Sequence, residues 1–224
     1  MKTISFINSK GGTGKTTLCA NVNAAIQKWF SATAILIDAD PQGSLRDWHN
    51  INQTNNCQLV CADTRQSLHS ATRLALSSNY DYMLIDTPGH LAQITGAAIS
   101  MSDLIIIPIQ PSPLDVWSTI DTIDIVKSAM QSNPSLQSLF VVNRATPNCR
   151  LTTDLLAAII EADPEQQIPV FGKIIHNRIA FARAASNGQT IFDLKDELAK
   201  TEIELLTIEI IQRLTDENTK QETK

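Results

Sequence analysis

Short apolar runs alternate along the chain with longer stretches in which apolar and polar residues follow the helical period. The runs predict strands over Thr3–Asn8, Ala34–Asp38, Gln58–Cys61, Tyr82–Asp86, Asp103–Ile109, Leu139–Asn143 and Gly172–Ile175. The longer stretches predict helices over Lys15–Trp29, Arg65–Ser78, Pro113–Gln131, Leu151–Glu161, Ala180–Asn187 and Asp193–Leu214. Most predicted strands are rich in Ile, Leu and Val, as strands buried on both faces are. This alternation predicts an α/β fold with a doubly wound, mostly parallel sheet and helices on both faces.

The pattern continues without a repeat, a proline-rich linker or a low-complexity block. The chain has 224 residues, of which 43% are hydrophobic and 18% charged, and this suits a single folded α/β domain. The last ten residues are polar and carry no periodic pattern. We therefore expect one domain over residues 1–214 and a polar C-terminal tail over residues 215–224.

Charge and cysteine content narrow the class of protein. The formal net charge of -5 argues against a surface that binds nucleic acid all over, so any DNA contact must come from a local patch. Of the four cysteines, Cys57 and Cys61 lie four apart, but no second Cys or His pair at zinc-finger spacing accompanies them. The first residues lead directly into a predicted strand, and no apolar run approaches the roughly 20 residues that span a bilayer. We expect a soluble, cytoplasmic protein with reduced thiols.

A glycine-rich segment joins the first predicted strand to the first predicted helix. It reads Lys10-Gly11-Gly12-Thr13-Gly14-Lys15-Thr16-Thr17, and this position between strand and helix is the one that a phosphate-binding Walker A loop occupies. Glycines let backbone amides approach phosphate oxygens, and the following helix directs its N-terminal amides at the same anion. Lys15 is expected to contact the β- and γ-phosphates, Thr16 to coordinate Mg²⁺, and Thr17 to bond near the α-phosphate.

Lys10 precedes the glycines and is poorly placed to reach the phosphates of its own subunit. With this lysine, the segment resembles the deviant Walker A motif, KGGxGK[ST]T, of the ParA/MinD family of ATPases. The resemblance implies a P-loop NTPase fold, the cofactors ATP and Mg²⁺, and an ATP-bound homodimer in which Lys10 contacts nucleotide across the interface. From the residues alone, Lys10 is only an exposed basic side chain.

Two acidic motifs follow predicted strands, at the sheet edge where open α/β sheets bind ligands. The segment from Asp38 to Gly43 resembles the DxDPQG switch I of the family. The resemblance implies that Asp40 orients or activates the attacking water and that Asp38 supports the Mg²⁺ shell and hydrolysis. Asp86 ends an apolar strand in the Walker B pattern and is expected to hold Mg²⁺, and the next three residues form switch II. The alternative for the first pair is two helix-capping acids.

Two later loops carry weaker signals. The segment from Pro108 to Asp115 resembles the PxxPSPLD loop that small plasmid-partition ParA proteins place at the dimer face near nucleotide, although an ordinary stiff loop is equally compatible. The sixth predicted strand ends in Asn143 and Arg144, where family members place an Asn or Thr and a basic residue beside adenine. The Asn143 amide suits a purine edge and the Arg144 plane can pack on a base, against the alternative of a simple strand-end turn. The lack of an NKxD motif also favours adenine over guanine.

Three basic residues, Lys173, Arg178 and Arg183, cluster in a segment whose family counterpart helps to form a non-specific DNA surface on the dimer. The alternative is scattered basic residues on a solvated helix. By resemblance, the ATP-bound dimer binds nucleoid DNA, and a ParB- or ParG-like centromere-binding partner stimulates hydrolysis. The expected role is plasmid or chromosome segregation.

Other roles share these motifs. A ParA-like ATPase that positions a protein cargo, such as a carboxysome or a chemoreceptor cluster, remains open, as does a nucleotide-binding scaffold without turnover. A MinD-like ATPase that binds membranes reversibly needs a basic amphipathic C-terminal helix. The predicted C-terminal helix of this chain is acidic, so no membrane partner is expected. Its apolar residues are interpreted as a face that packs on the core: Leu205, Leu206, Ile208, Ile210 and Ile211.

Overall fold

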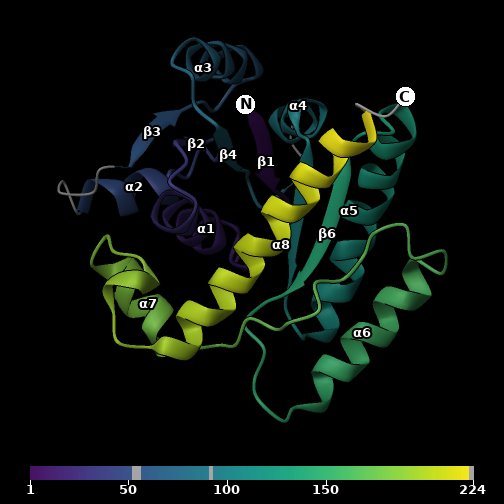
Figure 1. The fold of residues 1–224 in the computed structure, drawn as a ribbon. Coiled ribbons are helices and arrows are strands. Elements are labelled where there is room, and N and C mark those ends of the chain that lie inside the picture. The colour runs from purple at the N-terminus through teal and green to yellow at the C-terminus, as the bar shows by residue number, and fades with distance from the viewer. Residues whose placement is uncertain (52–56, 91–92, 222–224) are drawn as a thin grey trace.

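The computed structural model describes residues 1–51, 57–90 and 93–221, leaving aside the side chains of 113–118 and 216–221. Its strands are β1 (Lys2–Phe6), β2 (Ala34–Asp38), β3 (Gln58–Cys61), β4 (Tyr82–Asp86), β5 (Leu104–Ile109) and β6 (Gln137–Val142). Its helices are α1 (Lys15–Trp29), α2 (Ser44–Ile51), α3 (Arg65–Ser77), α4 (Gln93–Met101), α5 (Pro113–Ser132), α6 (Arg150–Ala162), α7 (Ile179–Ser186), the 3-10 turn η1 (Ile191–Asp193) and α8 (Glu197–Gln221) (Figure 1).

The six strands form one sheet in the order β3-β2-β4-β1-β5-β6, and each neighbouring pair is parallel. The register places Asp86 of β4 opposite Phe6 of β1 on one side and opposite Asp38 of β2 on the other. The ends of these three strands therefore meet at one edge, where the loops that follow them converge. The predicted doubly wound parallel fold is confirmed.

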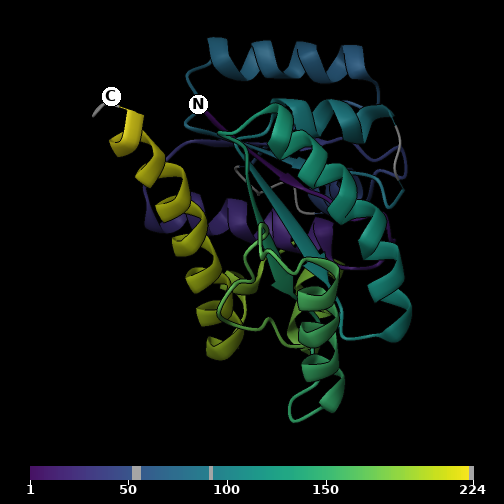
Figure 2. The same ribbon diagram turned by 90° about the vertical axis from the view of Figure 1, so that its right-hand side faces the viewer.

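Helices cover both faces of this sheet, with α1, α7 and α8 on one face and α3, α4, α5 and α6 on the other (Figure 2). Strand β5 shows how the two cores share one strand. Leu104 and Ile106 point into the core beneath α1 and α8, and Ile105 and Ile107 point into the core beneath α5 and α6. Because both sets are fully buried, the strand is apolar at successive positions rather than alternating.

Two parts of the secondary-structure prediction were wrong. The segment Gly172–Ile175 is not a strand; isolated bridges lie on either side of it, at Val170 opposite Phe140 of β6 and at His176 opposite Ala145. Pro169, which has no backbone N–H, and the flexible Gly172 flank Phe171 there and do not favour a continuous ladder. Helices α2 and α4 were not predicted, because each is short and directly follows a motif loop.

Helix α8 also differs from its prediction. It begins at Glu197 rather than near Asp193, which belongs to η1, and it continues to Gln221 through most of the expected tail. Leu206 and Ile210 are fully buried as predicted, but Leu205 and Ile208 are 37% and 40% exposed, so α8 carries apolar residues on both sides. Among the described helices, none combines the length and apolarity that a bilayer crossing requires.

Candidate nucleotide site

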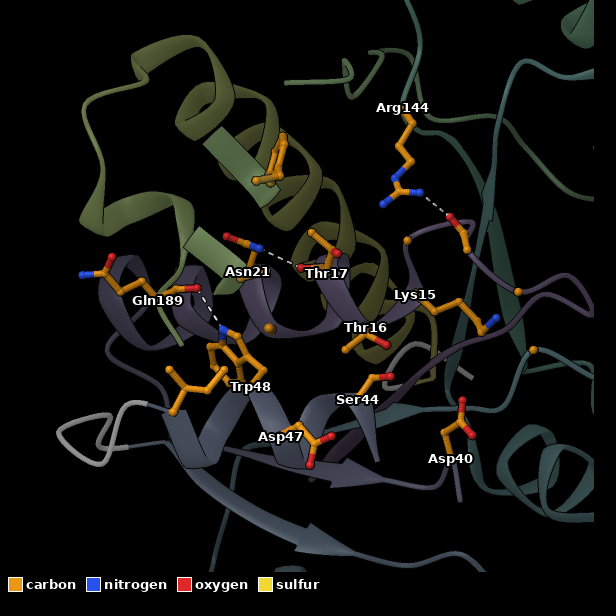
Figure 3. A pocket seen from close by; sticks show the side chains of 18 residues that line it. Lys15, Thr16, Thr17, Asn21, Asp40, Ser44, Asp47, Trp48, Arg144 and Gln189 are labelled. Carbon is orange, nitrogen blue, oxygen red and sulfur yellow. Dashed lines mark hydrogen bonds between the residues drawn. The ribbon is translucent and has the colours of Figure 1, made fainter. Parts of the chain in front are cut away.

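A cavity of about 510 Å³ opens at the carboxyl edge of the sheet, between the P-loop, α2 and α7 (Figure 3). Its walls include most of the motif residues that the sequence singled out: Gly11, Gly12, Gly14, Lys15, Thr16, Thr17, Asp40, Gly89 and Arg144. Residues from separate strand ends therefore face one space. A cavity at this edge of an open parallel sheet is the usual place for a ligand.

The P-loop is open to an anion. Gly12 and Gly14 have φ angles of 82° and 96°, in the left-handed region that favours glycine. A Cβ built on Gly11 or Gly12 would meet no atom within 4 Å, so this side of the loop is open for a ligand to approach the backbone. Helix α1 begins at Lys15, at the end of this cradle, and directs its free N-terminal amides toward it. This geometry suits a phosphate chain.

Lys15 lies against the loop and is buried. Its Nζ donates to the carbonyls of Asn8 at 3.1 Å and Lys10 at 3.0 Å. Burial lowers the pKa of Lys15, while the carboxylates of Asp86 and Asp40 oppose that shift. The ammonium is thus held by neutral carbonyls within the field of two acids, and a phosphate would be a stronger partner than either carbonyl.

Asn143 and Arg144 brace the P-loop rather than extend freely into the cavity. The Asn143 Nδ2 donates to the Thr13 carbonyl at 2.7 Å, and the Arg144 Nη1 donates to the Gly12 carbonyl at 2.7 Å. Gly12 O also accepts Gln110 Nε2, from the loop after β5, at 2.7 Å. Their contact with a base stays a prediction; the structure adds a loop-supporting role that the sequence pattern did not indicate.

The side chains of Thr16 and Asp86 are hydrogen-bonded to each other at the carboxyl edge of the sheet. The Thr16 hydroxyl donates to Asp86 Oδ2 at 2.6 Å, and the other carboxylate oxygen, Oδ1, is buried without a hydrogen-bond partner. Burial raises the pKa of Asp86 to about 7, although the Thr16 hydrogen bond opposes the shift. A buried orphan carboxylate oxygen beside a hydroxyl is the oxygen-donor chemistry that Mg²⁺ prefers, so these residues fit that ion.

The two acids of switch I differ in environment. Asp38 is buried, and its oxygens accept the backbone N–H groups of Asp40 at 3.1 Å and Arg46 at 2.8 Å. Burial raises the pKa of Asp38, and these two bonds oppose the increase. Asp40 is half-buried, lines the cavity and accepts the Gln42 N–H at 3.0 Å through Oδ1. Asp38 therefore shapes the switch I turn, and Asp40 presents its carboxylate to the cavity.

One wall of the cavity was not predicted. Trp48 of α2 donates its indole N–H to the Gln189 carbonyl at 2.9 Å (Figure 3), and the side-chain oxygen of Asn21 of α1 accepts the Ile191 N–H at 2.8 Å. These bonds tie the segment between α7 and η1 to the two helices beside the phosphate loop. A buried Trp in the short polar segment after switch I was the available sequence signal.

The predicted DNA contacts lie on the α7 side. Lys173 and Arg183 are exposed. Arg178 instead donates Nη2 to Glu202 Oε1 at 2.8 Å, and its Nη1 lies 3.9 Å from Asp196 Oδ1. Its charge is therefore largely compensated within the molecule. The side chain of Asp115, the last residue of the Pro108–Asp115 motif, lies outside the described side chains.

Comparisons with known proteins agree with the motif assignment. A family model described as VirC1 protein matches residues 1–220. The chain is 30% identical to the maintenance of carboxysome distribution protein A of Halothiobacillus neapolitanus, over 93% of this chain and 96% of that protein. It is 31% identical to the protein virC1 of Rhizobium rhizogenes, over 84% of this chain and 82% of the relative.

Solved structures share the fold. The ATP complex of a Cyanothece McdA variant superposes with a TM-score of 0.72 at 22% identity, covering 96% of each chain. The MinD cell division protein of Aquifex aeolicus superposes with a TM-score of 0.74 at 21% identity, covering 95% of this chain and 97% of MinD. With the family model matched along nearly the whole length, the chain belongs to the VirC1 family, within the ParA/MinD group of deviant Walker A ATPases.

Proposed function

We propose that this protein is an ATP-hydrolysing switch of the ParA type that segregates plasmid or chromosomal DNA. It forms a homodimer when ATP is bound, and the dimer binds nucleoid DNA without sequence preference. A ParB- or ParG-like centromere-binding partner stimulates hydrolysis, after which the subunits separate. The protein is cytoplasmic and nucleoid-associated in this cycle.

The observation that carries the nucleotide part of the proposal is the orphan Oδ1 of Asp86 beside the Thr16 hydroxyl, at the end of an open glycine cradle. ATP phosphates fit the cradle and Lys15, and Mg²⁺ fits the Thr16 and Asp86 oxygens, with Asp38 supporting its shell. Bound Mg²⁺ neutralises negative charge on the triphosphate. Asp40 faces the same cavity and orients the attacking water.

Lys10 is assigned to the dimer. The Lys10 carbonyl accepts Lys15 Nζ, so the residue adjoins the phosphate cradle, and its side chain is partly exposed. A cation there lies near the face that two nucleotide-bound subunits share, where it can reach the partner's triphosphate. Non-specific DNA binding is assigned to Lys173 and Arg183, because both are exposed cations on one segment and dimerisation doubles their number.

A second candidate is the positioning of a protein cargo. The relative from Halothiobacillus neapolitanus, matched over 96% of its length, is named for carboxysome distribution. The nucleotide chemistry is the same in both candidates, and they differ only in the partner that triggers hydrolysis.

Turnover of ATP with Mg²⁺ tests the catalytic assignment. Asp40→Ala is expected to lower the rate at least tenfold, with Asp47→Ala as the matched control, since Asp47 is an exposed acid on the same cavity wall. Equal rates for Asp40→Ala and the parent would remove Asp40 from the chemistry. Absence of turnover in the parent, with DNA present or absent, would favour the scaffold alternative.

Sedimentation with a non-hydrolysable ATP analogue tests the switch. The parent is expected to dimerise and to bind duplex DNA, and Lys10→Ala to do neither. Lys173→Ala with Arg183→Ala is expected to dimerise but to lose DNA binding, and Arg73→Ala, an exposed cation on α3, serves as the charge control. Stimulation of turnover by a centromere-binding protein, rather than by a cargo adaptor, separates the two candidates.

A further inference from the structure

A second, smaller cavity of about 120 Å³ adjoins the one that faces the P-loop. The two share Thr17, Arg144, Phe181 and Ala185 in their walls. Beyond these shared residues, the smaller cavity is bounded by the loop of residues 176–178, which leads into α7. The smaller cavity therefore lies directly beside the space into which a molecule bound at the cradle would extend.

The 176–178 loop is fixed on both sides. On the sheet side, the Asn177 N–H donates to the Ala145 carbonyl at 2.9 Å, next to the end of β6. On the other side its hydrogen bonds are to Glu202 of α8, and Arg178 Nη1 also lies 3.9 Å from Asp196 Oδ1. Oε2 of Glu202 accepts the His176 backbone N–H at 3.0 Å, and Oε1 lies 2.7 Å from His176 Nδ1 and 2.8 Å from Arg178 Nη2.

These contacts are not those of a solvated surface pair. The Glu202 side chain is 13% exposed, against 79% for Glu197 at the start of α8. Burial opposes ionisation of Glu202, but the hydrogen bonds from Arg178 and His176 outweigh it and lower its pKa. Three donors from two residues of one loop converge on a single carboxylate, so the loop has little freedom to move while Glu202 stays charged.

We propose that Glu202 is a positioning residue for the nucleoside half of the bound nucleotide, because it holds the loop of residues 176–178 as the wall of the smaller cavity. The inference rests on the proposed nucleotide site and adds a division of labour within it. The P-loop binds the phosphates, and α8, through Glu202, sets the shape of the nucleoside pocket. Glu202 itself lines neither cavity; it acts through His176 and Arg178, which line the smaller one.

This division is measurable, because inorganic tripolyphosphate carries the phosphates without the nucleoside. Glu202→Gln removes the charge and replaces one acceptor oxygen by an amide that faces Arg178 or His176. The variant is expected to bind ATP and ADP about tenfold more weakly, with tripolyphosphate affinity unchanged. In turnover, KM for ATP is expected to rise with kcat nearly constant, since the groups around the γ-phosphate are intact.

Glu209→Gln is the matched control. Glu209 lies on the same helix and pairs with an arginine, Arg213, at 2.7 Å, but this pair is within α8 and borders neither cavity. It should leave all three affinities unchanged. Arg178→Gln is the second variant, which removes the partner guanidinium and is expected to reproduce the selective loss. Thermal melts of each variant report whether the fold is kept.

Each possible result of these binding measurements has a different meaning. Loss of ATP binding with tripolyphosphate retained supports the proposal. Equal losses of affinity for ATP and for tripolyphosphate would overturn the proposal, because Glu202 would then support the whole domain. Unchanged affinity for both ligands would overturn it as well. A parent protein that binds tripolyphosphate but does not prefer ATP to it would overturn the nucleoside pocket while leaving the P-loop intact. A parent that binds neither would overturn the proposed nucleotide site, and the inference with it.

Discussion

The backbone of Gly89 in switch II lies directly against Gly11 of the P-loop. A Cβ built on Gly89 would lie 2.8 Å from Gly11 Cα and 2.9 Å from Gly11 N. Real Cβ atoms do not approach backbone this closely, and neither neighbour is a flexible side chain that can turn away. The loop that follows Asp86 and the loop that cradles phosphate are therefore in contact, and a displacement of one requires a displacement of the other.

Gly89→Ala is expected to separate these loops and to lower ATP turnover at least tenfold. The matched control is Gly96→Ala in α4, where an added Cβ meets no atom within 4 Å and alanine favours the helix. Gly96→Ala should keep the parent's rate and raise the melting temperature slightly. Steady-state rates and melts of both variants check this, and parent-like turnover of Gly89→Ala would show that the contact has no bearing on catalysis.

Asn143→Ala is expected to weaken ATP and tripolyphosphate binding in the same proportion, by about five- to tenfold, because its amide supports the Thr13 carbonyl of the phosphate loop. Titration calorimetry with both ligands measures the two losses. Thr146→Ala, an exposed position in the same loop, serves as the control. A loss confined to ATP would instead support the prediction that Asn143 contacts the base.

Asp86 gives the nucleotide-free protein a distinctive pH dependence. Its folded pKa of about 7 lies above the ordinary value of 3.8, so the native state holds a proton that the unfolded state releases. The associated stability is complete below about pH 3.8, declines as pH rises, and is lost above about pH 7. The Asp86→Asn variant has a side chain of nearly the same shape, but its amide does not ionise.

In buffer that contains a metal chelator, the free energy of unfolding of the Asp86→Asn variant should therefore exceed that of the parent. The difference should grow between pH 5 and pH 8, because only the parent ionises Asp86 in that range. Added Mg²⁺ with ATP should stabilise the parent at pH 8 but not the variant. Urea denaturation at the two pH values measures both effects. A margin that is constant with pH would contradict the raised pKa.

Trp48→Phe removes the indole N–H and leaves the buried Gln189 carbonyl without its donor. We expect a loss of about 1–3 kcal/mol in the free energy of unfolding, together with a smaller ATP affinity, since both residues line the nucleotide cavity. Trp29→Phe is the control, because Trp29 is 54% exposed. Urea denaturation measures the free energy of unfolding of both variants. Equal losses in Trp48→Phe and Trp29→Phe would mean that the Trp48 hydrogen bond contributes nothing to stability.

The parts of the fold that the sequence predicted well are those with local causes. Strand β5 was recognised because burial on both faces makes Leu104–Ile109 continuously apolar, and the P-loop because its backbone geometry demands particular residues at fixed spacing. Helix α4 was missed because Gln93–Met101 contains no charged residue, so it shows no polar face to set its period.

The contacts that the sequence did not reveal join distant segments. The amide of Asn143 pairs with Thr13, which is 130 positions away, and no local pattern indicates this supporting contact; the predicted base contact stays a prediction. The apolar positions of α8 were assigned to one buried face, but Leu206 is fully buried whereas its neighbour Leu205 is 37% exposed. Arg178 was counted as an exposed cation because its partner, Glu202, belongs to another helix.

The parallel sheet has a practical consequence for imaging and purification. Met1 precedes β1 at the edge opposite the phosphate loop, and α8 runs back to the same end, so the N mark and the last turn of α8 both lie at the top of Figure 1. A fluorescent protein or an affinity tag fused at Met1 would therefore sit away from the face on which nucleotide is handled. Fusions at that terminus are the ones to choose when the protein is followed in living cells.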